Sequence, residues 1–201
     1  VNPENDWAQC LTVEQLNAMW SPDAETNGID TWAKADSSFP DEPLALYGPG
    51  ADSGTFDYFT DEVNGDEGVS RGDYQASEDD NLIVNGVQGE KGGLGYFGYA
   101  YYEENKDALK SVEIENEAGD CVAPSRETIA DGSYNPMSRP LFFYAKVESY
   151  DNKPEVKAFV DYMIDPANGF LIEDVGYVAL PADAVAASQA RISEKKTGKD
   201  P

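Results

Sequence analysis

A glycine-rich turn between an apolar strand and a helix start is the segment of this chain best suited to chemistry. Residues 44–47 are apolar and predict a short buried strand, and a helix is expected to begin near Ser53. A helix N-terminus exposes unpaired backbone N–H groups and the positive end of the helix dipole, so this segment predicts an anion site. Ser53 and Thr55 add hydroxyl donors, and Gly54 lets a ligand approach the backbone because it has no Cβ.

The same residues also have a purely structural interpretation. Asp52 or Ser53 can cap the helix by accepting a hydrogen bond from its first turn, as such residues do in most proteins. The segment matches neither Gly-x-x-x-x-Gly-Lys-Ser/Thr nor Gly-x-Gly-x-x-Gly, so a nucleotide is not indicated. The anion site and the plain helix cap therefore both remain open at this point.

The overall charge restricts the partners that the chain can bind. Its 201 residues contain 39 Asp and Glu against 14 Lys and Arg, a formal net charge of −25. So few basic residues cannot form the basic stripe that nucleic acids require, and anionic membrane surfaces are disfavoured for the same reason. The chain has no His, which excludes Ser-His-Asp and Cys-His catalysis and every metal site that depends on imidazole.

The acidic residues are spread along the chain and do not form blocks. Dispersed Asp and Glu with few Lys favour a solvated surface adapted to high salt, and an ordinarily acidic extracytoplasmic protein is the alternative. A fall in stability at low salt would separate the two.

Two cysteines, Cys10 and Cys121, are the whole thiol content of the chain. They fit one structural disulfide formed in an oxidising compartment, and two unrelated buried thiols are the alternative. No apolar run approaches the ~20 residues that a membrane span requires. The chain starts at Val1 without a methionine, and we interpret it as a processed or truncated product.

Apolar patterns alternate between helices and short strands, which predicts an α/β fold. A capping box of Thr12 and Gln15 predicts a helix to Trp20, which Pro22 would end. Four further helices are predicted to start at Ser77, Tyr99, Ser125 and Pro154, and two more to cover residues 167–173 and 182–192. The predicted strands cover residues 44–47, 92–98, 111–115 and 140–147. Residues 21–43 are expected to be irregular, and residues 193–201 a polar, frayed tail.

Residues 140–147 are the strongest predicted strand. The run Pro140-Leu141-Phe142-Phe143-Tyr144-Ala145-Lys146-Val147 is almost continuously apolar, which is typical of a strand covered on both faces of its sheet. The helix from Pro154 follows it, with an apolar stripe at helical spacing.

Several motifs resemble one known family. They are residues 48–56 (Gly-Pro-Gly-Ala-Asp-Ser-Gly-Thr-Phe), 70–74 (Ser-Arg-Gly-Asp-Tyr), 77–81 (Ser-Glu-Asp-Asp-Asn), 93–101 (Gly-Leu-Gly-Tyr-Phe-Gly-Tyr-Ala-Tyr), 2–5 and 181–183. In these motifs, and over nearly its whole length, the chain resembles the phosphate-binding proteins that serve ABC-type phosphate importers. The resemblance implies a two-lobed α/β fold of the periplasmic-binding-protein type (type II), with one dehydrated phosphate held in a cleft.

By this resemblance the phosphate-binding residues are Ser53, Gly54 and Thr55, with Asp52 beside them. The family's usual Arg, four residues before the Ser, does not carry over because Pro49 stands there. Arg71 is the best remaining candidate for the cation, and an ion pair with Asp73 or Glu78 is its alternative role. No catalytic residue, metal or cofactor is implied.

The family is longer at its N-terminus than this chain, so the resemblance implies a fold that is incomplete there. Residues 1–137 would form a central lobe with the anion-binding helix start, and residues 138–201 the returning portion of the other lobe. The implied partners are inorganic phosphate, an ABC permease in the membrane and, as a further candidate, a separate N-terminal fragment. The implied location is periplasmic or extracytoplasmic, which includes secretion and anchoring at the cell surface.

Two other functions stay open on the residues alone. The many Asp and Glu would suit a glycosidase-like enzyme if two buried carboxyls lay in one cleft. The acidic stretch 73–80 would suit a Ca²⁺ module, although it lacks an Asp-x-Asp-x-Asp-Gly loop and a solvated helix start explains it more simply.

Overall fold

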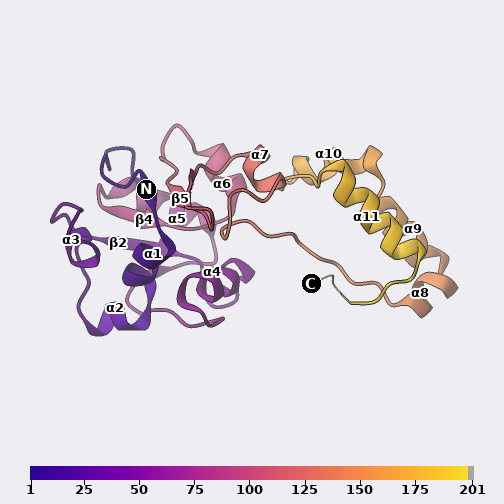
Figure 1. Ribbon diagram of the computed structural model, residues 1–201, viewed down its shortest axis with the longest axis horizontal. Helices are drawn as coiled ribbons and strands as arrows, with labels where there is room; N and C mark the ends of the chain where they lie inside the picture. Colours follow the sequence, from indigo (N-terminus) through magenta and orange to yellow (C-terminus); the bar gives the residue numbers. More distant parts are fainter. Residues whose placement is uncertain (199–201) are drawn as a thin grey trace.

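Side-chain burial is very uneven along the chain. The computed structural model describes residues 1–198, and both of its sheets lie within the first 122 residues (Figure 1). Beyond Ile114, Val160 is the only residue in this described part of the chain that is buried. The packed core therefore belongs to the sheet-bearing part, and the boundary at residue 137 stays a prediction.

The first sheet positions the segment singled out by the sequence. Its order is β3 (Gln75–Ala76), β2 (Ala45–Gly48) and β4 (Gly93–Gly95), and β2 pairs in parallel with both neighbours. Helices α4 (Gly54–Asn64) and α5 (Asp80–Gly89) make the two crossovers that parallel strands require. Because β2 is the central strand, the turn that follows it is fixed from both sides.

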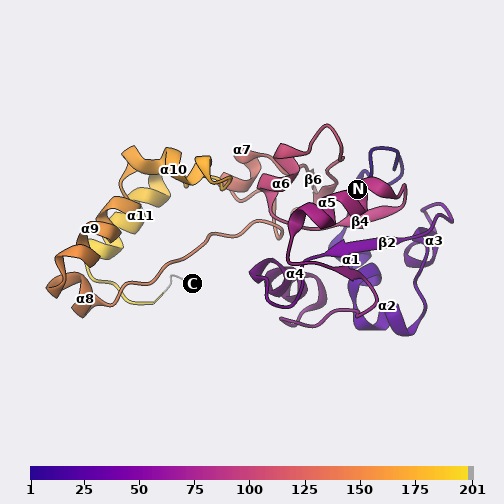
Figure 2. The ribbon, with the colours of Figure 1, turned by 180° about the vertical axis from the view of Figure 1, so that it is seen from behind.

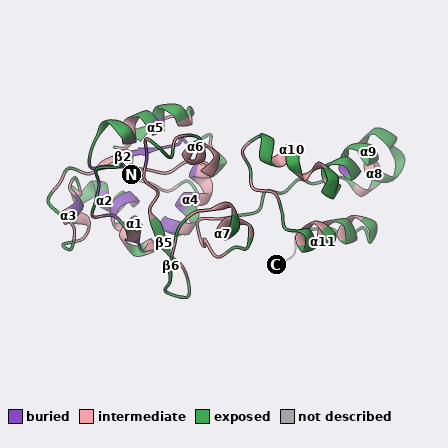
Figure 3. Ribbon diagram, turned by 90° about the horizontal axis from the view of Figure 1, so that it is seen from above, coloured by how far each residue is buried: buried purple, intermediate pink, exposed green. Residues whose placement is uncertain are grey.

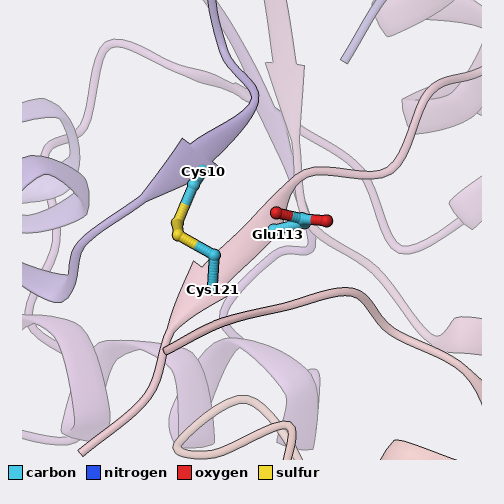
Figure 4. A group of neighbouring side chains, drawn as sticks. All are labelled: Cys10, Glu113 and Cys121. Carbon is cyan, nitrogen blue, oxygen red and sulfur yellow. A yellow bond between two sulfur atoms is a disulfide. The ribbon is translucent and has the colours of Figure 1, made fainter. Parts of the chain in front are cut away.

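The second sheet carries the predicted disulfide. Strand β5 (Glu113–Glu115) pairs in parallel with β1 (Cys10–Leu11) and antiparallel with β6 (Cys121–Val122). Cys10 and Cys121 are bonded across this sheet, with a Cα–Cα distance of 5.9 Å, next to the carboxylate of Glu113 (Figure 4). The bond joins residues that are 111 positions apart, and it confirms the predicted disulfide.

An aromatic cluster packs between helix α1 (Val13–Trp20) and the first sheet. Thr12 and Gln15 form the predicted capping box at the start of α1. Trp20, at the end of α1, is fully buried and makes edge contacts with Phe59 of α4 and with Tyr96, which follows β4. These contacts hold α1 and α4 against the end of the first sheet at which β2 leads into its turn.

Residues 21–43 are more regular than the sequence analysis predicted. Pro22 does not merely end α1, because it is the first residue of α2 (Pro22–Thr26), where its missing N–H costs nothing. Helix α3 (Trp32–Ala35) follows, and fully buried Trp32 packs against Phe39. Short helices of four or five residues have too few periodic positions to be seen in a sequence.

Two small helices complete the sheet-bearing part. Helix α6 (Tyr99–Glu104) and helix α7 (Arg126–Ala130) lie where they were predicted, and Ser125 caps α7 as expected. The cap of α5 was predicted wrongly: Asp79, not Ser77, accepts the hydrogen bond from the first turn.

The remaining helices lie apart from the two sheets (Figures 1 and 2). They are α8 (Val147–Asn152), α9 (Pro154–Met163), the 3₁₀ helix η1 (Pro166–Asn168), α10 (Gly169–Asp174) and α11 (Ala182–Ser193). Helix α9 begins at Pro154 as predicted, whereas α8 replaces the end of the predicted strand. Within residues 1–198, no helix is long and apolar enough to cross a membrane.

The predicted strand at residues 140–147 is wrong in this structure. Residues 138–146 lie in no helix or strand, and the side chains from Leu141 to Tyr144 are 46% to 73% exposed. A strand exists only through hydrogen bonds to a neighbouring strand, and no strand in residues 1–198 lies beside this segment. Residues 199–201 of the predicted polar tail lie outside the described residues.

Candidate functional site

The turn after β2 delivers the chain directly to the start of α4. Ser53 has extended backbone angles and is the N-cap of α4, and its Oγ accepts a hydrogen bond from the N–H of Thr55 at 3.2 Å. Asp52 does not make this cap, so of the two capping candidates Ser53 fills the role. The cap uses one N–H of the first turn and leaves Gly54 exposed at the helix start.

Two side chains from the neighbouring segment hold the turn. The hydroxyl of Tyr74 donates to the carbonyl of Pro49 at 2.8 Å, and the N–H of Asp52 donates to Oε1 of Glu78 at 3.4 Å. A Cβ on Gly50 would lie 2.1 Å from the same oxygen of Glu78, so any other residue there would make this exposed carboxylate move aside. The turn is thus a constrained structure that presents Ser53, rather than a loose loop.

Arg139 lies at the helix start, although no sequence pattern pointed to it. Its Nη2 donates to the carbonyl of Gly54 at 2.8 Å, and its guanidinium lies 4.9 Å from the ring centroid of Tyr58. Residues 54 and 139 are 85 positions apart, so only the fold could show that they meet. Arg139 is therefore an arginine at the start of α4 that the sequence analysis did not single out.

Tyr58 anchors the segment that carries Arg139. Its hydroxyl donates to the carbonyls of Pro136 and Ser138 at 2.6 and 3.3 Å. Burial, followed by the nearby carboxylate of Glu62, raises the pKa of Tyr58 to about 12, so the phenol stays protonated and remains a donor at neutral pH. One turn of α4 thus fixes both the Arg139 guanidinium and the backbone that precedes it.

Arg71 is not placed as the sequence analysis proposed. Its side chain is 6% exposed, its Nε and Nη2 bind both carboxylate oxygens of Asp73, and its Nη1 donates to the carbonyls of Met19 and Ile29. All three guanidinium nitrogens already have protein partners. The ion pair with Asp73, the alternative role for Arg71, is the one the structure contains.

The two non-transport alternatives find no support in the described residues 1–198. The buried polar residues there are Asn2, Asn5, Thr60 and Arg71, so no pair of buried carboxyls of the kind a glycosidase needs is present. The one close group of metal-ligand side chains in this range is Cys10, Glu113 and Cys121, whose two sulfurs are bonded to each other. The acidic stretch 73–80 brings no such cluster together.

A parallel sheet whose central strand ends in a constrained turn, a helix N-terminus and a nearby guanidinium defines an α/β ligand-binding domain suited to a small anion. The family profile of the PBP superfamily domain matches residues 1–167. The chain belongs to this family.

Similar proteins share most of this chain. Protein SphX of Synechocystis sp. is 45% identical over 183 residues, 91% of this chain, and the phosphate-binding protein PstS of Staphylococcus haemolyticus is 38% identical over 181 residues, 90% of this chain. A crystal structure described as a possible phosphate binding protein from Planctomyces limnophilus is 40% identical, covers 98% of this chain and superposes with a TM-score of 0.85.

The chain is shorter than these proteins. It spans 54% of the length of both the Synechocystis and the Staphylococcus protein, and 68% of the Planctomyces chain. The fold and the family follow from the matched part.

Proposed function

We propose that this chain is part of a solute-binding protein that captures inorganic phosphate and delivers it to the permease of an ABC importer. The observation that carries the proposal is the meeting of the α4 N-terminus with the Arg139 guanidinium at Gly54. The relative from Staphylococcus is named a phosphate-binding protein and the one from Planctomyces a possible phosphate binding protein, which supports the choice of anion.

The site holds phosphate with dipoles and one cation. The N–H groups at the start of α4 and the hydroxyls of Ser53 and Thr55 donate to phosphate oxygens, and Arg139 neutralises part of the charge. The backbone at Asp52 completes the turn but gives its own N–H to Glu78. Arg71 keeps its ion pair and takes no part.

This arrangement covers phosphate from one side. Gly54 and Arg139 are exposed, so a phosphate bound there still contacts water over much of its surface. Charge-assisted hydrogen bonds are strongest where water is excluded. We therefore expect weak, millimolar binding by this chain alone and tighter binding by a longer protein that closes over the site.

Function as a carrier requires binding and release, and no covalent step. The disulfide between Cys10 and Cys121 suits an oxidising compartment, which agrees with a periplasmic or extracytoplasmic location next to the permease. Anchoring at the cell surface belongs to the same proposal.

The test measures binding of radiolabelled phosphate by equilibrium dialysis to the wild-type chain and to paired variants. Arg139→Gln should lower the affinity about tenfold, because it removes a charge-assisted contact. Arg126→Gln is the matched control, since it removes the same charge from an arginine paired with Glu103 away from the site. Equal losses in the two variants would show a general charge effect and would reject the proposed site.

A second pair addresses the helix start itself. Gly54→Ala places a Cβ 3.2 Å from Nη2 of Arg139 and should displace the guanidinium, and Thr55→Ala removes a hydroxyl. Both should weaken phosphate binding while circular dichroism shows an unchanged helix content. Helicity and binding lost together would instead favour Ser53 as a plain cap.

A further inference from the structure

Three side chains of types that bind metal ions come together on the second sheet. The ligand atoms of Cys10, Glu113 and Cys121, two sulfurs and a carboxylate oxygen, lie within 4.8 Å of one another. Figure 4 shows the Glu113 carboxylate beside the bond between the two sulfurs. The phosphate binding proposed above uses none of the three, so the group is open to a separate role.

Backbone pairing holds the three residues in addition to the bond between the sulfurs. Cys10 and Glu113 lie directly opposite each other where β1 pairs with β5, and Cys121 lies on β6, which pairs with the other side of β5. The N–H of Glu113 also donates to the carbonyl of Gln9 at 3.0 Å. The three side chains therefore project from paired strands, whether or not the sulfurs are bonded to each other.

The group is accessible from solvent. Cys121 and Glu113 are exposed and Cys10 is half-buried. The turn between β5 and β6, next to the group, lies on the exposed surface of the sheet-bearing part (Figure 3). Within residues 1–198 the carboxylate of Glu113 makes no hydrogen bond or ion pair. A small reductant can therefore reach the sulfurs, and a cation can reach the carboxylate.

We propose that reduction of the disulfide turns Cys10, Cys121 and Glu113 into a binding site for a thiolate-preferring divalent cation of the zinc class. Two thiol groups of a reductant supply the electron pair and two protons, which leave two cysteine thiols on the chain, and the reductant becomes a disulfide. The cation then binds both sulfurs as thiolates, with release of their two protons, and binds the carboxylate of Glu113 as third ligand.

The geometry suits zinc. Tetrahedral Zn²⁺ binds sulfur at about 2.3 Å, which sets two bound sulfurs about 3.8 Å apart. The Cα atoms of Cys10 and Cys121 are 5.9 Å apart, so rotation of the side chains can separate the sulfurs while the strands stay paired. Three protein ligands leave the fourth position to water. Because bonded sulfurs are not thiolates, the disulfide and the metal site exclude each other.

The experiment reduces the 201-residue chain with dithiothreitol, removes the reductant under argon and titrates the chain with Co²⁺ in phosphate-free buffer. Sulfur-to-cobalt charge-transfer absorption should appear and saturate at one ion per chain, and its displacement by Zn²⁺ should give a micromolar or tighter zinc affinity. The unreduced chain should show no such absorption. Because phosphate is absent, the result does not depend on the proposed anion site.

A matched pair of variants tests the third ligand. Glu113 and Glu115 are both exposed residues of β5, but only Glu113 belongs to the group of three. Glu113→Gln should weaken zinc binding by the reduced chain about tenfold or more, because it removes a charged ligand. Glu115→Gln removes the same charge from the same strand and should leave the zinc affinity unchanged.

A second measurement follows the fold of the reduced chain. Near-ultraviolet circular dichroism reports the packing around Trp20 and Trp32, and thermal unfolding reports stability. Zn²⁺ should raise the unfolding temperature of the reduced chain and leave that of the oxidised chain unchanged, because an ion that binds only the folded reduced chain stabilises it.

Four results would overturn the proposal. One is the absence of sulfur-to-cobalt absorption in the reduced chain. Another is equal weakening of zinc binding by Glu113→Gln and Glu115→Gln. The third is a stoichiometry of one ion per two chains with a dimer mass, which would place the sulfurs of two copies on one ion. The last is a reduced chain that loses its packing and does not recover it with Zn²⁺.

Discussion

Arg71 and Arg139 are residues of the same type, but the groups around their side chains differ. The Arg71 guanidinium is enclosed by Asp73 and by the carbonyls of Met19 and Ile29, whereas Arg139 reaches the exposed start of α4. The motif around Arg71 suggested that its guanidinium binds a ligand, but the carboxylate of nearby Asp73 already accepts two of its hydrogen bonds. The two arginines therefore differ in how many N–H donors their protein partners leave over.

The ion pair of Arg71 should contribute to stability in a pH-dependent way. The hydrogen bond from Arg71 lowers the pKa of Asp73 below the ordinary aspartate value of 3.8, so the contribution is present above that pH and is lost as the pH falls through the folded-state pKa. Asp73→Asn should destabilise the chain at pH 7 by about 1–2 kcal/mol, a figure reduced because Asp73 is half exposed. Urea unfolding at a series of pH values measures this difference.

The control for this prediction is an exposed ion pair. Asp30 also binds a cation, Lys34, but both side chains are at least half exposed. Asp30→Asn should leave the unfolding free energy almost unchanged, because solvent screens this exposed pair. A difference between wild type and Asp73→Asn that stays constant from pH 7 down to about pH 3 would contradict the pair's role.

Helix α5 and strand β2 approach so closely that a glycine is required between them. A Cβ on Gly86 would lie 2.2 Å from the ring of Tyr47, a buried residue of β2, whereas a Cβ on Gly89 in the same helix would meet nothing within 4 Å. Gly86→Ala should therefore destabilise the chain by about 1–3 kcal/mol. Thermal unfolding by calorimetry provides the measurement.

Gly89→Ala tests whether the effect of Gly86→Ala is steric. Alanine favours a helix over glycine by up to about 1 kcal/mol, so Gly89→Ala should be neutral or stabilising. Similar changes for the two variants, in either direction, would mean that Tyr47 can move aside and that the contact between α5 and β2 is not fixed.

The elements that were predicted correctly carry local signals. Helix α1 has its capping box and α9 has proline at its first turn, and both lie where the sequence placed them. The segment 140–147 has an equally strong local pattern but forms no strand, because a strand depends on partners that residues 1–198 do not supply. Local chemistry thus predicted these longer helices, missed short ones such as α2 and α3, and predicted strands correctly only where their partners are present.

The candidate site was predicted in part for the same reason. The strand, turn and helix that present Ser53 to Thr55 are contiguous in sequence and were recognised, and the structure assembles them as expected. Arg139 was missed because it is 85 positions away from Gly54 in the sequence and meets it only in the folded chain. Contacts over such separations leave no pattern in a single sequence.

On the scale of the whole molecule, the surface carries an excess of negative charge, whereas the candidate site contains an arginine and a helix N-terminus. The net charge of −25 lies on a chain with 14 basic residues, and one of these, Arg139, lies at the exposed N-terminus of α4. The negative charge that excludes nucleic acids as partners therefore does not exclude one small anion at the start of α4. The remaining carboxylates face solvent, where dissolved cations can screen their repulsion.

Adaptation to high salt remains a prediction that follows from this surface. Raising KCl from about 0.1 M to about 2 M should raise the unfolding temperature by several degrees, because screening relieves repulsion among the carboxylates. The effect should shrink near pH 4, since the isoelectric point is about 4.1. An unfolding temperature that does not respond to KCl at pH 7 would identify an ordinarily acidic protein.

The central claim is that the start of α4 binds phosphate together with Arg139. The most direct measurement is a titration of the isotopically labelled chain with inorganic phosphate, followed by nuclear magnetic resonance of its backbone amides and arginine side chains. The account predicts saturable shifts concentrated at Ser53, Gly54, Thr55 and the Arg139 guanidinium, with Arg71 unmoved. Shifts that are absent, spread evenly over the molecule, or centred on Arg71 would contradict it.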